Sequence, residues 1–366
     1  MVARHLAVFA VLVAACSQAS PAAAVTPSAV ATPSEVAATP SPVADLPLTK
    51  LGFSCRLPVF TYEIGGFTRT VQGGFVHFPR AELVIDPNAR FSQDSQGVLT
   101  GETGPVLHGQ GDVFYDAGEL RWVPVSAQQS RPDGFEYAYS TVEPGTNATI
   151  VHVVDVATGE DRTFRVNMSE GLTVADYRAS GVYLLKAPGL GGPSEGVWLM
   201  NPNTGAVKQL RAVHNVWAVR NGIAWVARLD ARDKTQWPPI ELPPANSIIR
   251  VDLATGAEQT WFYRAGTYPW WLGFGPSGWP VIFTGLGEQG VREIRLLDHA
   301  NENGQLVYSG KIDFVRVQGD GGRLWLGATQ GVYLYRRGTG LQKVFAYQQP
   351  QPDGLARVIL PTGFCL

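Results

Sequence analysis

The sequence predicts an all-β fold, and three observations support that prediction. The chain of 366 residues contains 41 glycines and 26 prolines but only 16% charged residues, a composition typical of many short strands and tight turns. From about residue 51 onward, short runs of β-branched and aromatic residues alternate with turns of Asp, Asn and Gly. One strand–turn–strand pattern also returns at nearly regular intervals, which indicates an internal repeat.

The repeated pattern is an apolar strand, a turn that starts with Asp or Asn and closes with Gly, and a second strand. Asp and Asn side chains accept hydrogen bonds from nearby backbone amides, and Gly adopts the positive φ of a tight turn, so each copy is predicted to be a β-hairpin. Clear copies occupy residues 150–166, 196–210 and 247–263, and looser copies occupy residues 112–125, 293–309 and 331–345.

The spacing of these hairpins predicts a β-propeller. The turn glycines stand at positions 118, 159, 205, 256, 304 and 340, so successive turns are 41, 46, 51, 48 and 36 residues apart. A repeat of about 45 residues with four strands is typical of propeller blades. We expect six blades, and seven is the alternative because residues 51–366 have room for about seven such repeats. The six blades are expected to begin near Cys55, Ser126, Val174, His214, Tyr268 and Ile312.

The two ends of the propeller region are expected to close the ring, because an open ring would leave strand edges exposed to other chains. Cys55 and Cys365 lie near these ends, and an oxidising compartment permits a disulfide between them. Chain entropy sets an upper estimate of about 5 to 6 kcal/mol for such a bond. The alternative is two unpaired thiols. The first blade is expected to carry a polar loop over residues 88–111.

The first 16 residues have the pattern of an export signal. Residues 6–15 form an apolar run that is too short to span a bilayer, which needs about 20 residues, but suits a signal peptide. The run ends in Val-Ala-Ala-Cys16, which resembles the bacterial lipoprotein signal motif. The resemblance implies that residues 1–15 are removed and that Cys16 is acylated, which anchors the protein to the outer face of a membrane. An ordinary signal peptide is the alternative, and the choice between inner and outer membrane stays open.

Residues 16–50 are predicted to be a linker that begins with the lipidated cysteine. Most of this segment consists of Ala, Pro, Ser, Thr and Val. Recurrent prolines favour extended polyproline II over helix or sheet, so residues 17–46 would be a semi-rigid spacer with a reach of roughly 90 Å if fully extended. Residues 51–366 would then form the propeller domain.

Two segments resemble known propeller repeats. Residues 130–140, SRPDGFEYAYS, resemble the SPDGxxIAF repeat of TolB-like propellers, and residues 320–335, DGGRLWLGATQGVYLY, resemble the DxxGxLWxGTxxGLYxY repeat of bacterial sensor propellers. As a whole, residues 51–366 resemble uncharacterised bacterial lipoproteins of this build. These resemblances imply an architecture and no particular activity.

The sequence lacks the usual marks of several function classes. The net charge of −2 gives no basic face for phosphates, so no nucleic-acid partner is expected. The six histidines and three cysteines show no metal-ligand spacing, and no GxSxG, P-loop or GxGxxG motif occurs. We therefore expect no metal and no cofactor.

Propellers usually bind ligands where the inner strands converge at the mouth of the channel, so polar and aromatic residues near inner-strand starts are the candidate site. The candidates are Asp176, His214, Tyr268, Trp270 and Asp313. His214 and Asp313 would suit a base and its orienting carboxylate, or would join Asp176 as metal ligands. The favoured alternative is that they only hydrogen-bond and solvate the rim. Tryptophans in the blades are expected to pack between neighbouring sheets.

Together these features favour a tethered, monomeric binding module for a protein, a peptide or a cell-envelope glycan. The first alternative is a hydrolase or lyase with its site at the channel mouth, and the second is an accessory subunit of an envelope complex. An enzyme is the less favoured of these readings because no catalytic spacing was found.

Overall fold

The fold is described from a computed structural model of the chain. The chain divides into two units, Met1–Pro40 and Ser41–Leu366. The structure describes residues 46–366, except 65–68, 144, 147, 169–170, 187–194, 236–244, 286–290, 301, 313 and 348–355. The first unit, with the predicted signal peptide and Cys16, lies outside the described residues. No helix in the described part of the chain has the length and hydropathy of a membrane span.

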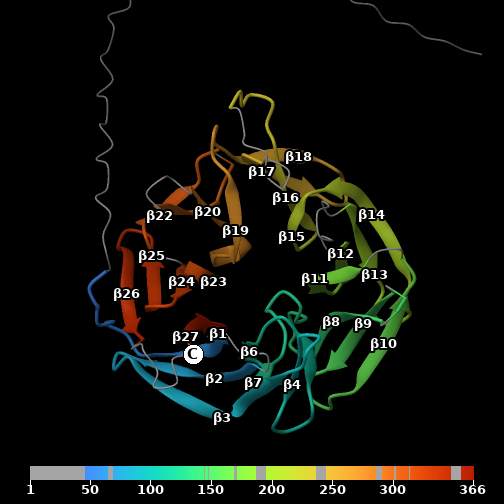
Figure 1. Cartoon of the computed structure of the whole chain (residues 1–366), viewed down its shortest axis with the longest axis horizontal. Coiled ribbons are helices and arrows are strands. Elements are labelled where there is room, and N and C mark those ends of the chain that lie inside the picture. Colours follow the sequence, from blue (N-terminus) through green and yellow to red (C-terminus); the bar gives the residue numbers. More distant parts are fainter. Residues whose placement is uncertain are drawn as a thin grey trace, which may run out of the picture. The chain divides into compact units, whose positions relative to one another are not determined.

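The second unit is an all-β propeller of six blades, which confirms the sequence prediction in preference to seven (Figure 1). Four blades are antiparallel four-stranded sheets whose strands follow chain order from the innermost to the outermost. They are blade 3 (β11 Leu172–Arg178, β12 Gly181–Lys186, β13 Glu195–Met200, β14 Val207–His214), blade 4 (β15 Val216–Arg220, β16 Ile223–Arg228, β17 Ser247–Asp252, β18 Glu258–Tyr263), blade 5 (β19 Pro269–Phe274, η1 Pro276–Gly278, β20 Pro280–Thr284, β21 Arg292–Leu296, β22 Gln305–Gly310) and blade 6 (β23 Phe314–Asp320, β24 Arg323–Ala328, β25 Gly331–Arg336, β26 Gly340–Ala346).

Blade 2 has three named strands and a short inner segment. The strands are β8 Glu136–Val142, β9 Thr149–Asp155 and β10 Asp161–Val166. On the inner side of β8, Ser130 forms a β-bridge with Tyr137, and the amide of Ala138 donates to the carbonyl of Gln129 over 2.9 Å. The segment before β8 therefore takes the place of an inner strand.

Blade 1 is built from both ends of the propeller. Its strands are β1 Cys55–Ile64, β2 Arg69–Phe78, β3 Glu82–Gln93, β4 Val98–Gly101 and β5 His108–Gln110, with β27 Ala356–Pro361 as the innermost strand. Strand β27 pairs antiparallel with β1 from Val59↔Pro361 onward, which closes the ring as predicted. The expected polar loop over residues 88–111 is instead largely sheet, because β3 continues and β4 and β5 add to it. A separate hairpin, β6 Phe114–Asp116 and β7 Arg121–Val123, follows.

The predicted disulfide between Cys55 and Cys365 is present and fastens this closure. The two Cα atoms are 5.5 Å apart and the bond links residues 310 positions apart in sequence. Beside it, the backbones of Arg56 and Leu366 exchange two hydrogen bonds of 3.1 Å. The residues after β27 thus continue the pairing with β1 up to the disulfide.

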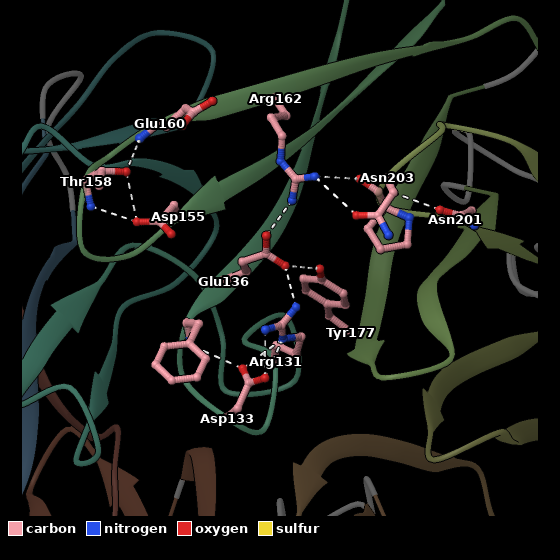
Figure 2. Close-up of polar contacts among 12 residues, drawn as sticks. Arg131, Asp133, Glu136, Asp155, Thr158, Glu160, Arg162, Tyr177, Asn201 and Asn203 are labelled. Carbon is pink, nitrogen blue, oxygen red and sulfur yellow. Dashed lines mark hydrogen bonds and ion pairs between the residues drawn. The ribbon is translucent and has the colours of Figure 1, made fainter.

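The hairpin turns repeat one geometry, which explains the sequence repeat. In the turns that start at Asp155, Asn201 and Asp252, the Oδ1 atom accepts hydrogen bonds from the amides two and three residues later. The closing glycines Gly159, Gly205 and Gly256 have φ between 69° and 78°, in the left-handed region that favours glycine. Parts of the first two of these turns are visible in Figure 2.

The hydrophobic core lies mainly in the seams between neighbouring blades. Trp325 of blade 6 is fully buried and stacks on Phe78 of blade 1, with ring centroids 5.7 Å apart. Trp261 of blade 4 stacks on Trp279 of blade 5 over 5.6 Å. These pairs confirm that tryptophans pack between blades, where a large flat side chain buries apolar area on both sheets.

Candidate functional site

The inner strands all end on the same side of the ring, where each turns into the second strand of its blade. We call this side the AB face, because it carries the turns between the first (A) and second (B) strands of the blades. It is defined by the turns after β11, β15, β19 and β23, at residues 179–180, 221–222, 275–279 and 321–322. A cavity of about 360 Å³ lies here, within the usual size of small-molecule sites. Its wall includes Ser130, Arg131, Arg178, Arg220, Phe274, Gln318 and Phe364, so all six blades contribute to it.

The arginines of blades 3 and 4 reach the cavity because each is the last residue of its inner strand. Arg178 ends β11 and Arg220 ends β15. After Arg220, Asn221 and Gly222 both have positive φ, of 52° and 74°, as a two-residue hairpin turn requires. The amide of Asn221 also donates to Asp176 of blade 3 over 2.9 Å, which fixes the turn against the neighbouring blade.

Arg131 belongs to a network that joins blades 2 and 3 (Figure 2). Its guanidinium binds both carboxylate oxygens of Asp133, over 2.8 and 2.7 Å, and donates to Glu136 over 2.7 Å. Glu136 also accepts hydrogen bonds from Arg162 and from the Tyr177 hydroxyl, the latter over 2.6 Å. The hydrogen bond with Asp133 raises the pKa of Arg131. This arginine is therefore fully engaged with carboxylates.

Arg178 has one carboxylate partner, the buried Asp176. The two side chains form a two-pronged ion pair, with Nε–Oδ2 and Nη2–Oδ1 distances of 2.9 and 2.7 Å. Asp176 is 0% exposed. Burial raises the pKa of Asp176, whereas the charge of Arg178 and its hydrogen bond act in the opposite direction. Such a paired geometry is what allows a carboxylate to remain inside a protein.

Arg220 is the exception among these arginines. Within the described part of the chain, no carboxylate lies within ion-pair distance of it, and its buried Nε has no hydrogen-bond partner. The guanidinium instead lies over the ring of Phe274, 4.8 Å from the centroid. Burial lowers the pKa of Arg220, and the neighbouring charge of Arg178 lowers it further. Its normal pKa is so high that it nevertheless keeps its charge.

The rest of the wall is polar and aromatic. The Ser130 hydroxyl is buried without a hydrogen-bond partner among the described residues, and Ser130 is only 4% exposed. Phe364 is 46% exposed and meets Phe114 edge to face, with centroids 6.5 Å apart. An unsatisfied hydroxyl, an unpaired cation and an open aromatic edge are the groups from which a ligand site can be built.

A second arginine–aspartate cluster involves the inner strand of blade 6. Arg316 of β23 binds both carboxylate oxygens of Asp112, which precedes β6, with an Nη1–Oδ1 distance of 2.5 Å. The two side chains are 22% and 14% exposed. Burial raises the pKa of Asp112 and the charge of Arg316 opposes this. Here one carboxylate meets one guanidinium.

The structure does not bring the residues predicted from sequence together in one place. Asp176 lies near the end of β11, next to Arg178. His214 is the exposed last residue of β14, the outermost strand of blade 3. Tyr268 and Trp270 lie at the start of β19, half-buried, with ring centroids 4.7 Å apart.

The inner strands run in the same direction around the ring, so their starts and ends lie on opposite faces. Asp176 is therefore not brought together with Tyr268 and Trp270. Asp313 lies outside the described residues. No group of three or more His, Cys, Asp or Glu side chains suited to a metal ion occurs among the residues that the structure describes.

Sequence reasoning missed Arg178, Arg220 and Ser130. A signal was available for the first two, because both inner strands end in Arg directly before a tight turn, in VADYR and VWAVR. No sequence pattern predicts that Arg220 lacks a carboxylate partner, because this depends on which side chains surround Arg220 in the folded ring.

Comparison with known proteins yields only distant structural matches. No family model and no curated protein sequence matches the chain. Solved structures that match include a prolyl endopeptidase at 11% identity (TM-score 0.48) and TolB from Acinetobacter baumannii at 13% identity (TM-score 0.36). The match covers 82% of this chain and 51% of the endopeptidase, and 70% of this chain and 71% of TolB.

An oligogalacturonate lyase in complex with manganese also matches, at 10% identity with a TM-score of 0.31, over 77% of this chain and 75% of the lyase. The chain thus spans about half the length of the endopeptidase. Enzymes and TolB occur together among these matches, so the likeness is one of fold alone. The assignment as a propeller rests on the strand order described above.

Proposed function

We propose that this chain is a lipid-anchored binding module on the outer face of a membrane, and that its AB face takes the ligand. The observation that carries the proposal is the cavity at this face, to which all six blades contribute charged, polar or aromatic groups. Inner strands held in sheets keep such groups in place before a ligand arrives, and this preorganisation lowers the entropy cost of binding. The expected ligands are a protein, a peptide or a cell-envelope glycan.

The anchor in this proposal rests on the sequence. Cys16 would carry the acyl chains, and the proline-rich linker would hold the propeller, a monomeric domain, away from the membrane. A Cys16→Ser variant is expected to move from the membrane fraction to the soluble exported fraction. A Ser17→Ala variant serves as the matched control and is expected to stay with the membrane. Equal membrane retention of both variants would contradict the anchor.

The binding role is tested by following both binding and turnover. The purified exported protein is titrated with fractionated peptides and glycans of the envelope while its Tm is recorded, because a ligand that binds only the folded state raises Tm. Each compound that raises Tm is then analysed by mass spectrometry after incubation. Saturable binding of an unchanged compound supports the proposal. Chemical conversion of the compound would contradict the binding module and favour the enzyme alternative. A stable co-purifying protein would favour the accessory subunit of an envelope complex.

A further inference from the structure

Three arginines line the cavity, and they differ in how many carboxylates neutralise them. Arg131 has two carboxylate partners, and Arg178 has one. Arg220 has none among the described residues. Asp176 contacts Arg178 directly and acts on Arg220 only through its charge, so Arg220 has no carboxylate in contact.

This unpaired charge is costly where it lies. A charge that is removed from water is stabilised only by an opposite charge or by hydrogen bonds. The ring of Phe274 offers Arg220 a weak cation–π contact, and the adjacent Arg178 repels it. An anion in the cavity would relieve both effects.

Among the described residues, the acidic side chains of the wall form no ion pair with Arg220. Asp133 is bound by Arg131 through both oxygens. Asp116 uses Oδ1 to accept hydrogen bonds from the amides of Gly118 and Glu119, over 2.8 and 3.2 Å. Asp133 is therefore paired with a cation, whereas Asp116 is bound by backbone amides, keeps its negative charge and forms no ion pair with Arg220.

We propose that the cavity binds a small organic anion, in which a carboxylate pairs with Arg220 and a flat apolar group packs against Phe364. A guanidinium presents two parallel N–H donors that match a planar carboxylate. Ser130 lies in the same wall, but its hydroxyl is itself buried, so the carboxylate contact depends on Arg220. The exposed ring of Phe364, at the edge of Phe114, offers apolar area. This inference rests on the proposed function, because it gives the binding face a ligand chemistry.

The test uses benzoate as the probe, with benzamide as its neutral equivalent in shape and inorganic phosphate as a non-planar anion. Each is titrated into the full exported chain by isothermal calorimetry and by ligand-observed NMR. Benzoate is expected to bind saturably, at least tenfold more tightly than benzamide and more tightly than phosphate. Equal affinity for benzoate and benzamide would overturn the proposal. Tighter binding of phosphate, or no saturable binding of benzoate, would also overturn it.

Variants assign the effect to the cavity. Arg220→Gln is expected to weaken benzoate binding at least tenfold, whereas Arg220→Lys keeps the charge and loses less. The matched control is Arg228→Gln in the same blade, where Arg228 forms an exposed ion pair with Glu258 over 2.7 Å. This control is expected to bind benzoate as the unmodified chain does. Unchanged binding by Arg220→Gln would contradict the proposal.

A second variant covers the case in which Arg220→Gln does not fold, as judged by circular dichroism. Phe364→Ala removes an exposed ring and is expected to weaken benzoate at least threefold while benzamide changes in parallel. Unchanged benzoate affinity in this variant would then overturn the proposal. If an envelope compound binds unchanged while benzoate does not bind, the anion site fails and the binding module stands. If a compound is turned over while benzoate binds through Arg220, the binding module fails and the anion site stands.

Discussion

Two clusters of arginine and aspartate are attached to the inner strands, and they differ by one charge. Asp112 and Arg316 form a closed pair of one carboxylate and one guanidinium. Asp176 serves Arg178 by direct contact, while Arg220 stands beside them without a carboxylate of its own. The same residue types thus support two different roles. The balanced pair supports the ring, whereas the unbalanced cluster leaves a charge for a ligand.

The balanced pair lies in the region that closes the ring. It joins residues 204 positions apart in sequence, and the disulfide joins residues 310 positions apart. Of these two links, only the covalent disulfide restricts the unfolded chain, and it does so over a very long loop. The unbalanced cluster instead joins the neighbouring blades 3 and 4 and adds no such long-range link. Stability and binding should therefore respond differently to changes in the two regions.

The largest effect is expected for the disulfide. Cys365→Ser should lower the free energy of unfolding by about 4 kcal/mol, because the unfolded chain regains freedom over a very long loop. Urea denaturation at pH 7 measures this change. The unmodified chain with reductant serves as the control and should match the variant. Equal stability of the oxidised chain and the variant would show that the strand pairing of β27 with β1 suffices.

Removal of Arg316 should have the next largest effect. Arg316→Gln leaves the Asp112 carboxylate buried without a cation, with only the Val113 amide as a hydrogen-bond donor, at a cost of about 3 kcal/mol. Burial already raises the pKa of Asp112, and loss of Arg316 removes the opposing effect. A carboxyl with a raised folded pKa favours the folded state at low pH and loses that contribution as pH rises. The loss should therefore be larger at pH 8 than at pH 5, and a pH-independent loss would contradict a titrating Asp112.

Removal of Arg220 should change stability least among these variants. Arg220→Gln deletes a charge that has no carboxylate partner, so the free energy of unfolding should change by less than about 1 kcal/mol or even rise. Urea denaturation at pH 7 measures this change in the free energy of unfolding, in parallel with that of Arg316→Gln. A loss as large as that of Arg316→Gln would show that Arg220 has a structural role, and the contrast between the clusters would disappear.

The hairpin turns offer the smallest effect and a natural control. Hydrogen bonds from the amides of Thr158 and Thr255 lower the pKa of Asp155 and of Asp252, respectively. A carboxylate with a lowered folded pKa stabilises the fold above its unfolded pKa of about 3.9 and loses that contribution as pH falls further. Asn201 makes the same turn without titrating.

The double variant Asp155→Asn, Asp252→Asn should therefore lose less Tm than the unmodified chain between pH 5 and pH 2.5, by a difference on the order of 1 °C. Asn201→Asp should change in the opposite direction, and thermal unfolding monitored by circular dichroism measures both. Identical acid profiles for all three chains would contradict the role of these turns. Since these turns lie at the outer hairpins, this test separates their contribution to stability from that of the two arginine–aspartate clusters.

The fold was largely predictable because it repeats. The predicted blade starts near Val174, His214, Tyr268 and Ile312 lie within a few residues of the observed inner strands, which begin at 172, 216, 269 and 314. Turn chemistry is local, so Asp, Asn and Gly mark it in the sequence. The added strands β4 and β5 were missed because the polar residues there show little strand alternation.

The site was less predictable because it is assembled from all six blades. Sequence placed candidate side chains at the starts of inner strands, where Tyr268 and Trp270 do lie, whereas the cavity described here forms at the opposite ends of these strands. Arg178 and Arg220 occupy equivalent strand ends, yet only one has a carboxylate partner. Arg178 pairs with Asp176 of its own strand, where the strand of Arg220 has Ala218. Whether a neighbouring blade supplies a carboxylate to Arg220 is not visible in its own segment.

The order of strands in blade 1 determines when the ring can close during folding. Strand β27 follows every other strand in the chain, yet it is the innermost element of the first blade. During synthesis from the N-terminus the middle blades can form early, but the ring cannot close until β27 has been made and pairs with β1. The edge of β1 stays unpaired until then, which makes the interval before β27 pairs the time of greatest risk of aggregation.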